Sequence, residues 1–125
     1  MHDVRIINNE AVLFDGDIEM NLEPYRKNDD IRYDFDDDSY VSISRYNTIS
    51  WHGSNGFFHR DGDIPAIILH HGDMVYCKHG KTHRENGPAR IRDDGDVEYW
   101  IDDIEYTKDQ YINKLNSNYG MIYYA

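Results

Sequence analysis

An internal repeat of hairpin length constrains the fold of this chain more than any other feature. Residues 56–60 (Gly-Phe-Phe-His-Arg) align with residues 80–84 (Gly-Lys-Thr-His-Arg), and Pro65-Ala66 aligns with Pro88-Ala89. The His-Arg pairs lie 24 residues apart and the Pro-Ala pairs 23 apart, so the first copy has one extra residue between positions 61 and 64. Each copy contains a short alternating run, a glycine turn and a second run, which predicts stacked β-hairpins.

The remainder of the chain also has the pattern of strands and turns. Short alternating runs broken by Asp, Asn and Gly predict strands over residues 4–7, 11–14, 18–22, 31–35, 40–44 and 48–51. The longest expected loop covers residues 23–29, which include a proline. We therefore predict a mainly β fold, an antiparallel hairpin-repeat meander that forms a curved sheet of about eight to ten strands.

A short helix is expected near the C-terminus. Thr107 and Gln110 have the spacing of a capping box, and apolar residues then recur at helical spacing up to Leu115. The predicted helix covers residues 107–117, and Gly120 ends it. We expect a single domain over residues 1–125, with N-terminal hairpins in 1–45, hairpin repeats in 46–106 and the helix in 107–117.

Period-two alternation assigns the residues of the repeats to two faces of the sheet. The face expected to lie in the core contains Ala66, Ile68, Met74, Tyr76, Ala89, Ile91, Val97, Tyr99 and Ile101. The opposite face contains Ile67, Leu69, Val75, Cys77, Arg90, Arg92, Glu98 and Trp100. The helix or the N-terminal hairpins are expected to cover Ile67 and Leu69; the alternative is that these residues contact a partner.

The chain is strongly acidic. Its 13 basic and 24 acidic residues give a formal net charge of −11, which disfavours direct binding to nucleic acid and favours a protein partner with a basic surface. Acidity that only keeps the protein in solution is the alternative. The acidic run that contains Asp34, Asp36, Asp37 and Asp38 is interpreted either as a solvated edge that prevents aggregation or as a decoy for a basic groove.

The sequence offers no recognisable catalytic or metal-binding set, and we predict no cofactor. The seven histidines do not have the spacing of a zinc site, and Cys77 is expected within a strand, where nothing lowers its pKa. A structural role is expected for the motif residues His59, Arg60, His83, Arg84, Gly87 and Pro88. A small-ligand site, a metal site or an enzyme that uses the His-Arg loops remains the alternative.

The repeat resembles short β-hairpin repeats with the pattern W-x-x-x-G-x-x-H-R-x-x-G-P-A, followed by a strand and an Asp-Gly turn. Such repeats occur in proteins of large-genome bacteriophages and some giant viruses, and they are distantly similar to MORN-type hairpin repeats. Residues 80–89 match this pattern well, whereas residues 51–66 match with the inserted residue and with Ile64 before the proline. The resemblance covers about residues 50–117 and implies a viral origin, but no single activity.

These observations predict a non-enzymatic protein-binding module, an inhibitor that a phage directs at a host defence or nucleic-acid-handling protein. The residues expected to contact the partner are Asp34, Asp36, Asp37, Asp38, Trp51, Ile67, Leu69, Arg90, Arg92 and Trp100. A homodimer is a further option. With one cysteine, no signal-peptide pattern and no membrane-spanning run, a cytoplasmic location is expected.

Overall fold

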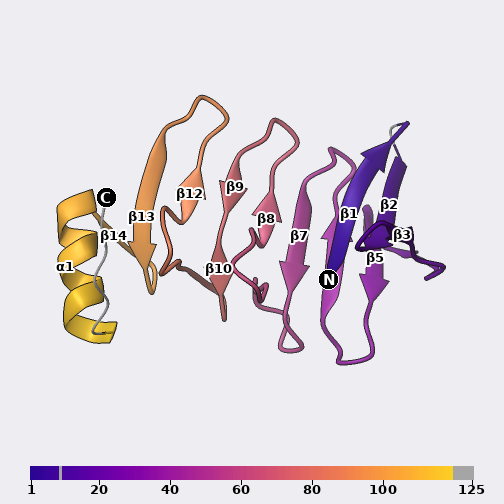
Figure 1. Cartoon of the computed structure of the whole chain (residues 1–125). Helices are drawn as coiled ribbons and strands as arrows, with labels where there is room; N and C mark the ends of the chain where they lie inside the picture. Colours follow the sequence, from indigo (N-terminus) through magenta and orange to yellow (C-terminus); the bar gives the residue numbers. More distant parts are fainter. Residues whose placement is uncertain (9, 120–125) are drawn as a thin grey trace.

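The computed structural model describes residues 1–8 and 10–119 and contains one long antiparallel sheet, a smaller sheet near its N-terminal end and a helix at its other end (Figure 1). In chain order the strands are β1 (His2–Ile7), β2 (Glu10–Asp15), β3 (Ile18–Glu19), β4 (Tyr25–Lys27), β5 (Asp30–Asp34), β6 (Tyr40–Ile43), β7 (Ile49–His52), β8 (Ile67–Ile68), β9 (Met74–Val75), β10 (Cys77–Lys78), β11 (Lys81–Thr82), β12 (Arg90–Ile91), β13 (Val97–Ile101) and β14 (Ile104–Tyr106). The helix α1 spans Lys108–Tyr119. The predicted mainly β hairpin fold with one C-terminal helix is confirmed.

The long sheet is a meander of nine strands in the order β14-β13-β12-β9-β8-β7-β6-β5-β4. Strands β1, β2 and β3 form a separate sheet, and β10 pairs only with β11. Two predictions were wrong in detail. The strand expected over 18–22 is only two residues long: the Met20 N–H makes a last bond to the Leu13 carbonyl at 2.9 Å, and the side chains of Met20 and Leu22 pack against the core. The loop expected over 23–29 contains β4, an exposed edge strand whose side chains have no buried face to create alternation.

One type of turn recurs along the chain: it joins β5 to β6, β6 to β7, β8 to β9 and β12 to β13, and it also follows β7. The first residue donates its N–H to the carbonyl of the residue four positions on, and the residue three positions on adopts a positive φ. This is the type I turn followed by a left-handed residue that is common in hairpins. Its left-handed residues are Asp38, Asn47, Gly56, Gly72 and Gly95. The two repeats therefore use the same turn as the hairpins that precede them.

The strand register places the side chains of the long sheet on two faces. One cross-strand row consists of Arg26, Ile31, Ile43, Ile49, Ile68, Met74, Ile91 and Val97, and we call its side the covered face. The other row consists of Tyr25, Arg32, Ser42, Ser50, Ile67, Val75, Arg90 and Glu98, and we call its side the open face. The predicted division of the repeat residues between two faces is confirmed.

The small sheet and α1 both pack on the covered face. Val4 and Leu13 of the small sheet form a core cluster with side chains such as Val41 and Trp51, and α1 forms another through Leu115. The sheet residues in both clusters belong to the covered face, so the expectation that these layers cover Ile67 was wrong. Ile67 instead packs on a small cluster of Ala66, Val75 and Cys77.

The extent of these layers also corrects the predicted core. Val97 was expected to be buried but is 44% exposed, because α1 packs further along β13, on Tyr99 and Ile101. Val75 and Cys77, on the opposite face, are only 8% and 7% exposed. Burial in the repeats is therefore not restricted to one face.

The predicted capping box begins α1. The Thr107 hydroxyl accepts the N–H of Gln110 at 3.2 Å, and the Gln110 side chain accepts the N–H of Thr107 at 3.0 Å. The helix is longer than predicted and reaches Tyr119; the expected stop at Gly120 lies outside the described residues. Among the described residues, no helix is long and apolar enough to cross a membrane.

Candidate functional site

The His-Arg pair of the first repeat connects the repeats to the N-terminal strand. The Arg60 guanidinium lies 4.0 Å from the Trp51 ring centroid, and it donates to the carbonyls of Pro65 at 3.1 Å and His2 at 2.7 Å. Burial lowers the pKa of Arg60, and nearby Asp3 opposes that effect. Arg60 is therefore a structural cation held between an aromatic ring and two carbonyl oxygens.

The second repeat makes the same contacts with different neighbours. The Arg84 guanidinium lies 3.9 Å from the Tyr76 ring centroid and donates to the carbonyl of Pro88 at 3.1 Å. It also donates to the Asp63 carboxylate of the first repeat at 2.9 Å. Arg84 therefore joins the two copies, whereas Arg60 joins the first copy to β1.

The two motif histidines have equivalent bonds. His59 Nδ1 accepts the backbone N–H of His79 at 3.0 Å, and its Nε2 lies 2.8 Å from Asp61. His83 Nδ1 accepts the backbone N–H of Asp102 at 3.1 Å, and its Nε2 lies 3.0 Å from Glu85. Both nitrogens of each ring are engaged within the protein, so these histidines are poorly placed to serve as metal ligands or proton-transfer groups.

A cleft lies beside the first His-Arg pair. Its volume is about 590 Å³, within the range of small-molecule sites. Met1 and His2 border it, together with the turn 37–39, the turn 53–55 and the loop 59–62. Phe35 and Trp51 line it and are parallel, with ring centroids 6.0 Å apart, and His2 stacks on Phe35 at 4.4 Å.

Two carboxylates belong to the cleft. Asp37 receives hydrogen bonds from the Ser39 hydroxyl and the Ser39 N–H, and these hold the pKa of Asp37 below its ordinary value. The Asp61 side chain is 89% exposed. His52 also lines the cleft, and burial lowers its pKa, so it is neutral near pH 7. The cleft therefore combines aromatic walls with carboxylate oxygens.

The open face carries a stack of rings and a guanidinium that runs across β4 to β7 and beyond. The Arg32 guanidinium lies 3.6 Å from the Tyr40 ring centroid, Tyr40 stacks on His52 at 4.4 Å, and the His52 ring lies 4.8 Å from that of Phe58. Tyr25 lies at the other end, 5.7 Å from Arg32. We call this set, Tyr25, Arg32, Tyr40, His52 and Phe58, the aromatic ladder.

Sequence reasoning missed the ladder. Tyr25 was expected in a loop, and alternation within each strand does not show that Tyr40 and His52 lie opposite each other. The five-residue turn from Ser44 to Thr48 was the available signal, since turn length fixes which residues of a hairpin lie opposite each other.

Of the predicted acidic contact residues, Asp34 lies at one end of the aromatic ladder and the other three lie in the turn between β5 and β6. Asp34 accepts hydrogen bonds from Tyr25 at 2.7 Å and Arg32 at 3.0 Å. Partial burial opposes their effect, yet these bonds lower the pKa of Asp34. Asp36, Asp37 and Asp38 are exposed in the turn that follows β5. The negative charge of Asp34 is thus compensated by its neighbours, while the turn presents its negative charge to solvent.

The remaining predicted contact residues lie in different surroundings. Trp51 is 6% exposed on the covered face, where it lines the cleft and does not belong to the open face. Arg90 and Arg92 lie around Glu98, with the shortest contact at 2.6 Å from Arg92, and the half-buried Trp100 donates to the same carboxylate at 3.0 Å. Ile67 and Leu69 are half-buried. Ile67 and Arg90 belong to one row of the open face, which also contains Glu98.

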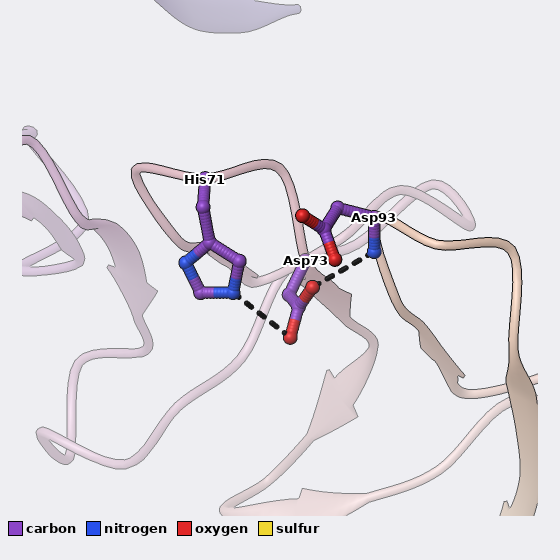
Figure 2. A group of neighbouring side chains, drawn as sticks. All are labelled: His71, Asp73 and Asp93. Carbon is purple, nitrogen blue, oxygen red and sulfur yellow. Dashed lines mark hydrogen bonds and ion pairs between the residues drawn. The ribbon is translucent and has the colours of Figure 1, made fainter.

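Two other groups have side chains that are able to react or to bind a metal ion. Burial raises the pKa of the Cys77 thiol to about 11, which makes it unreactive. His71, Asp73 and Asp93 lie close together (Figure 2), but Asp73 already accepts the N–H of Asp93 at 2.8 Å and contacts His71 at 3.1 Å. The Arg92 guanidinium lies 4.0 Å from the same Asp73 carboxylate. This group connects two turns, and its nearby cation opposes the binding of a metal ion.

Comparison with known proteins adds no relative from which a function could be transferred. No family model, no curated protein and no solved structure matches this chain. The open face and the cleft are therefore the features of this chain that bear on its function.

Proposed function

We propose that this protein is a non-enzymatic module that binds another protein through its open face. The observation that carries this proposal is the aromatic ladder, whose ends Tyr25 and Phe58 are 42% and 40% exposed. Phe57, next to Phe58, is 58% exposed. Aromatic and arginine side chains contribute most of the binding energy of protein interfaces, and exposed clusters of them mark contact sites.

The ladder is already ordered before a partner arrives. Neighbouring members of the ladder lie 3.6 to 5.7 Å apart, and Asp34 fixes both Tyr25 and Arg32 by hydrogen bonds. Side chains held in this way lose little additional freedom on binding, so more of the contact energy appears as affinity. A rigid, partly apolar surface of this kind suits a protein better than a small polar ligand.

Charge supports a partner with a basic surface. The chain has a formal net charge of −11, and the turn that contains Asp36 to Asp38 lies at the end of β5, a strand of the ladder. Complementary charge increases the rate of association and excludes acidic partners. The viral occurrence of the repeats that this chain resembles supports a host defence or nucleic-acid-handling protein as the target.

The competing function, ligand binding or catalysis by the His-Arg loops, has less support. Both nitrogens of His59 and His83 are occupied, and Arg60 and Arg84 each stack on a ring and donate to carbonyl oxygens. These side chains hold the repeats together. Releasing one of them to act on a substrate would leave a backbone N–H or carbonyl without its partner.

The test is capture of a partner from bacterial lysate on immobilised wild-type protein and on the variant Tyr25→Ser/Phe58→Ser. The matched control is Tyr46→Ser, which removes an aromatic ring that is 64% exposed in a turn outside the ladder. We expect the affinity of a captured protein for the ladder variant to be at least about tenfold lower than for the wild type, which corresponds to the loss of one interface hot spot. The control Tyr46→Ser should bind it with the affinity of the wild type. Equal binding by all three proteins would contradict the proposal.

A further inference from the structure

The cleft of the first repeat has a shape and a charge that the second repeat lacks. In the second copy the corresponding space holds a pocket of about 130 Å³, and the Asp63–Arg84 ion pair is part of its wall. In the first copy the space is about 590 Å³. The repeat motif therefore does not create the cleft; the inserted residue and the N-terminal strand do.

The loop that follows His59 is built to border this cleft. Gly62 has a φ of 90°, and a Cβ atom at that position would lie 3.1 Å from the Met1 side chain. Glycine adopts this backbone conformation without the strain that a residue with a side chain would have there. As a result Asp61 lines the cleft, while Asp63 bonds Arg84 of the second copy. With the extra residue, the same loop borders the cleft through Asp61 and bonds the second copy through Asp63.

The charges of the cleft favour a cation. The α-ammonium group of Met1, which also borders the cleft, is paired with Asp15 at 2.7 Å, and Arg60 is the only arginine or lysine among the described lining residues. Its guanidinium is held by Trp51, by two carbonyls and by Asp3 at 3.8 Å, and its side chain is only 10% exposed. Among the described residues, neither Asp37 nor Asp61 forms an ion pair with an arginine or lysine; Asp37 is bonded by Ser39 and Asp61 contacts His59. The aromatic walls offer a surface for the aliphatic part of a long side chain.

The cleft is continuous with the surface proposed to bind a partner. His52 stacks on Tyr40 in the aromatic ladder and also lines the cleft. A protein that lies on the ladder therefore brings its own side chains to the mouth of the cleft. Charge complementarity selects which of those side chains enters.

We propose that this cleft receives an arginine or lysine side chain of the partner protein, held by the carboxylates of Asp37 and Asp61. This inference rests on the proposed function, because it takes the occupant from a protein partner. It defines the kind of partner further, as one that presents a basic side chain next to an aromatic-binding surface. The cleft then acts as an electrostatic anchor at the edge of the interface.

The test uses the full chain, labelled with ¹⁵N, and N-acetyl-arginine N-methylamide as the probe. The neutral control probe is the corresponding citrulline compound, which has nearly the same shape. We expect saturable shifts of the backbone amides of Ser39, Gly53, Asn55 and Gly62 with the arginine probe and much smaller shifts with citrulline. Equal binding of the two probes, or the absence of saturable shifts at these amides, would overturn the inference.

A matched pair of variants assigns the binding to the cleft. Asp37 and Asp94 occupy the same place in equivalent turns, where each carboxylate accepts the N–H two residues on. Asn55 does the same in a third turn, so asparagine is compatible with this position. We expect Asp37→Asn and Asp61→Asn each to weaken the arginine probe about fivefold, and Asp94→Asn to leave it unchanged. Equal effects of Asp37→Asn and Asp94→Asn would indicate only a general effect of net charge.

The two proposals can fail separately. If a captured partner depends on Tyr25 and Phe58 but the arginine probe does not bind, the protein-binding function stands and the cleft anchor is wrong. If no partner depends on the ladder, the proposed function fails, and saturable arginine binding would then assign the cleft to a free cationic ligand instead of a protein side chain.

Discussion

The first copy of the repeat, around His59 and Arg60, and the second, around His83 and Arg84, make the same local contacts. In each, the arginine lies over an aromatic ring and bonds the carbonyl of the Pro-Ala proline. In each, the histidine accepts an N–H from the following tight turn. The motif is therefore a structural unit that orders one loop over one strand.

The neighbours of the two copies differ. Tyr111 of α1 closes the second copy, where its hydroxyl donates to the carbonyl of Arg84 at 2.6 Å and accepts the N–H of Gly87 at 3.2 Å. The first copy lies beside Met1 and His2, and a cleft remains between them. In a stacked array of repeats, the end that is capped contributes stability and the end that stays open is available for binding.

The next position of the array shows how the helix replaces a third copy. Trp51 and Tyr76 each carry an arginine on the ring, whereas Tyr99 carries the ring of Tyr111, with centroids 4.9 Å apart. The His-Arg motif is absent from the sequence after residue 102, where a third copy would place it. An aromatic side chain from α1 thus takes the place of the arginine and ends the array.

The largest effect is expected from removing this cap. Tyr111 is 0% exposed, so Tyr111→Ala should lower the free energy of unfolding by about 3–5 kcal/mol. Tyr111→Phe keeps the ring and should lower it by about 1–2 kcal/mol, because the Gly87 N–H loses its acceptor. Urea unfolding followed by tryptophan fluorescence measures both. A loss below about 1 kcal/mol for Tyr111→Ala would show that the cap contributes little.

The two motif histidines should differ in their effect on stability. The side chains of His83 and its partner Glu85 are 7% and 35% exposed, whereas those of His59 and Asp61 are 14% and 89% exposed. We expect His83→Ala to cost about 2 kcal/mol and His59→Ala about 1 kcal/mol, since an unpaired N–H costs more where water is excluded. Urea unfolding of the two variants checks the order. Equal or reversed losses would contradict the distinction between a closed and an open copy.

The link between the copies should have a smaller effect. Asp63→Asn weakens the ion pair with Arg84 and should cost about 0.5–1 kcal/mol, as expected for a partly exposed pair. Asp61→Asn, two residues away, changes the same charge at a side chain that is 89% exposed and should cost less than about 0.5 kcal/mol. Thermal unfolding compares them. If Asp61→Asn destabilises the protein more than Asp63→Asn, the ion pair between Asp63 and Arg84 does not contribute to holding the two copies together.

Local patterns in the sequence predicted the scaffold better than the site. Alternation of Ala89, Arg90 and Ile91 predicted the two faces because the period of a strand depends only on its own residues. Thr107 and Gln110 predicted the start of α1 for the same reason. The edge strand β4 could not be recognised in this way, because Tyr25 to Lys27 are all exposed and show no alternation.

The cleft and the ladder depend on contacts between distant residues. Arg60 bonds the carbonyl of His2, and residues around 37, 53 and 61 complete the same cleft. Nothing in the spacing of these residues indicates that they meet. Trp51 was expected at the surface for a related reason: the small N-terminal sheet that buries it could not be placed on either face from the sequence.

The smallest predicted change in stability concerns positions that are apolar in the first copy and charged in the second. The first copy has Ile67, Leu69 and Val75 where the second has Arg90, Arg92 and Glu98. A hydrogen bond from Arg92 holds the pKa of Glu98 below its ordinary value. A carboxyl with a lowered pKa in the folded state stabilises the protein above its unfolded pKa, and that stability is lost as the pH falls through the folded value. The ion pairs of the second copy therefore contribute above the unfolded pKa of a glutamate, about 4.3, and are lost in acid, whereas the contribution of the apolar set of the first copy is independent of pH.

Glu98→Gln tests this difference. We expect it to lower the free energy of unfolding by about 0.5 kcal/mol at pH 7, because the carboxylate is partly exposed and its pairs are screened. The difference from wild type should shrink below about pH 4, where Glu98 of the wild type also becomes neutral. Val75→Thr, at the equivalent position of the first copy, should show a loss that does not change between these two pH values, since neither side chain titrates. A loss for Glu98→Gln that persists unchanged at low pH would mean that the side chain of Glu98 acts through packing with Trp100 and not through its charge.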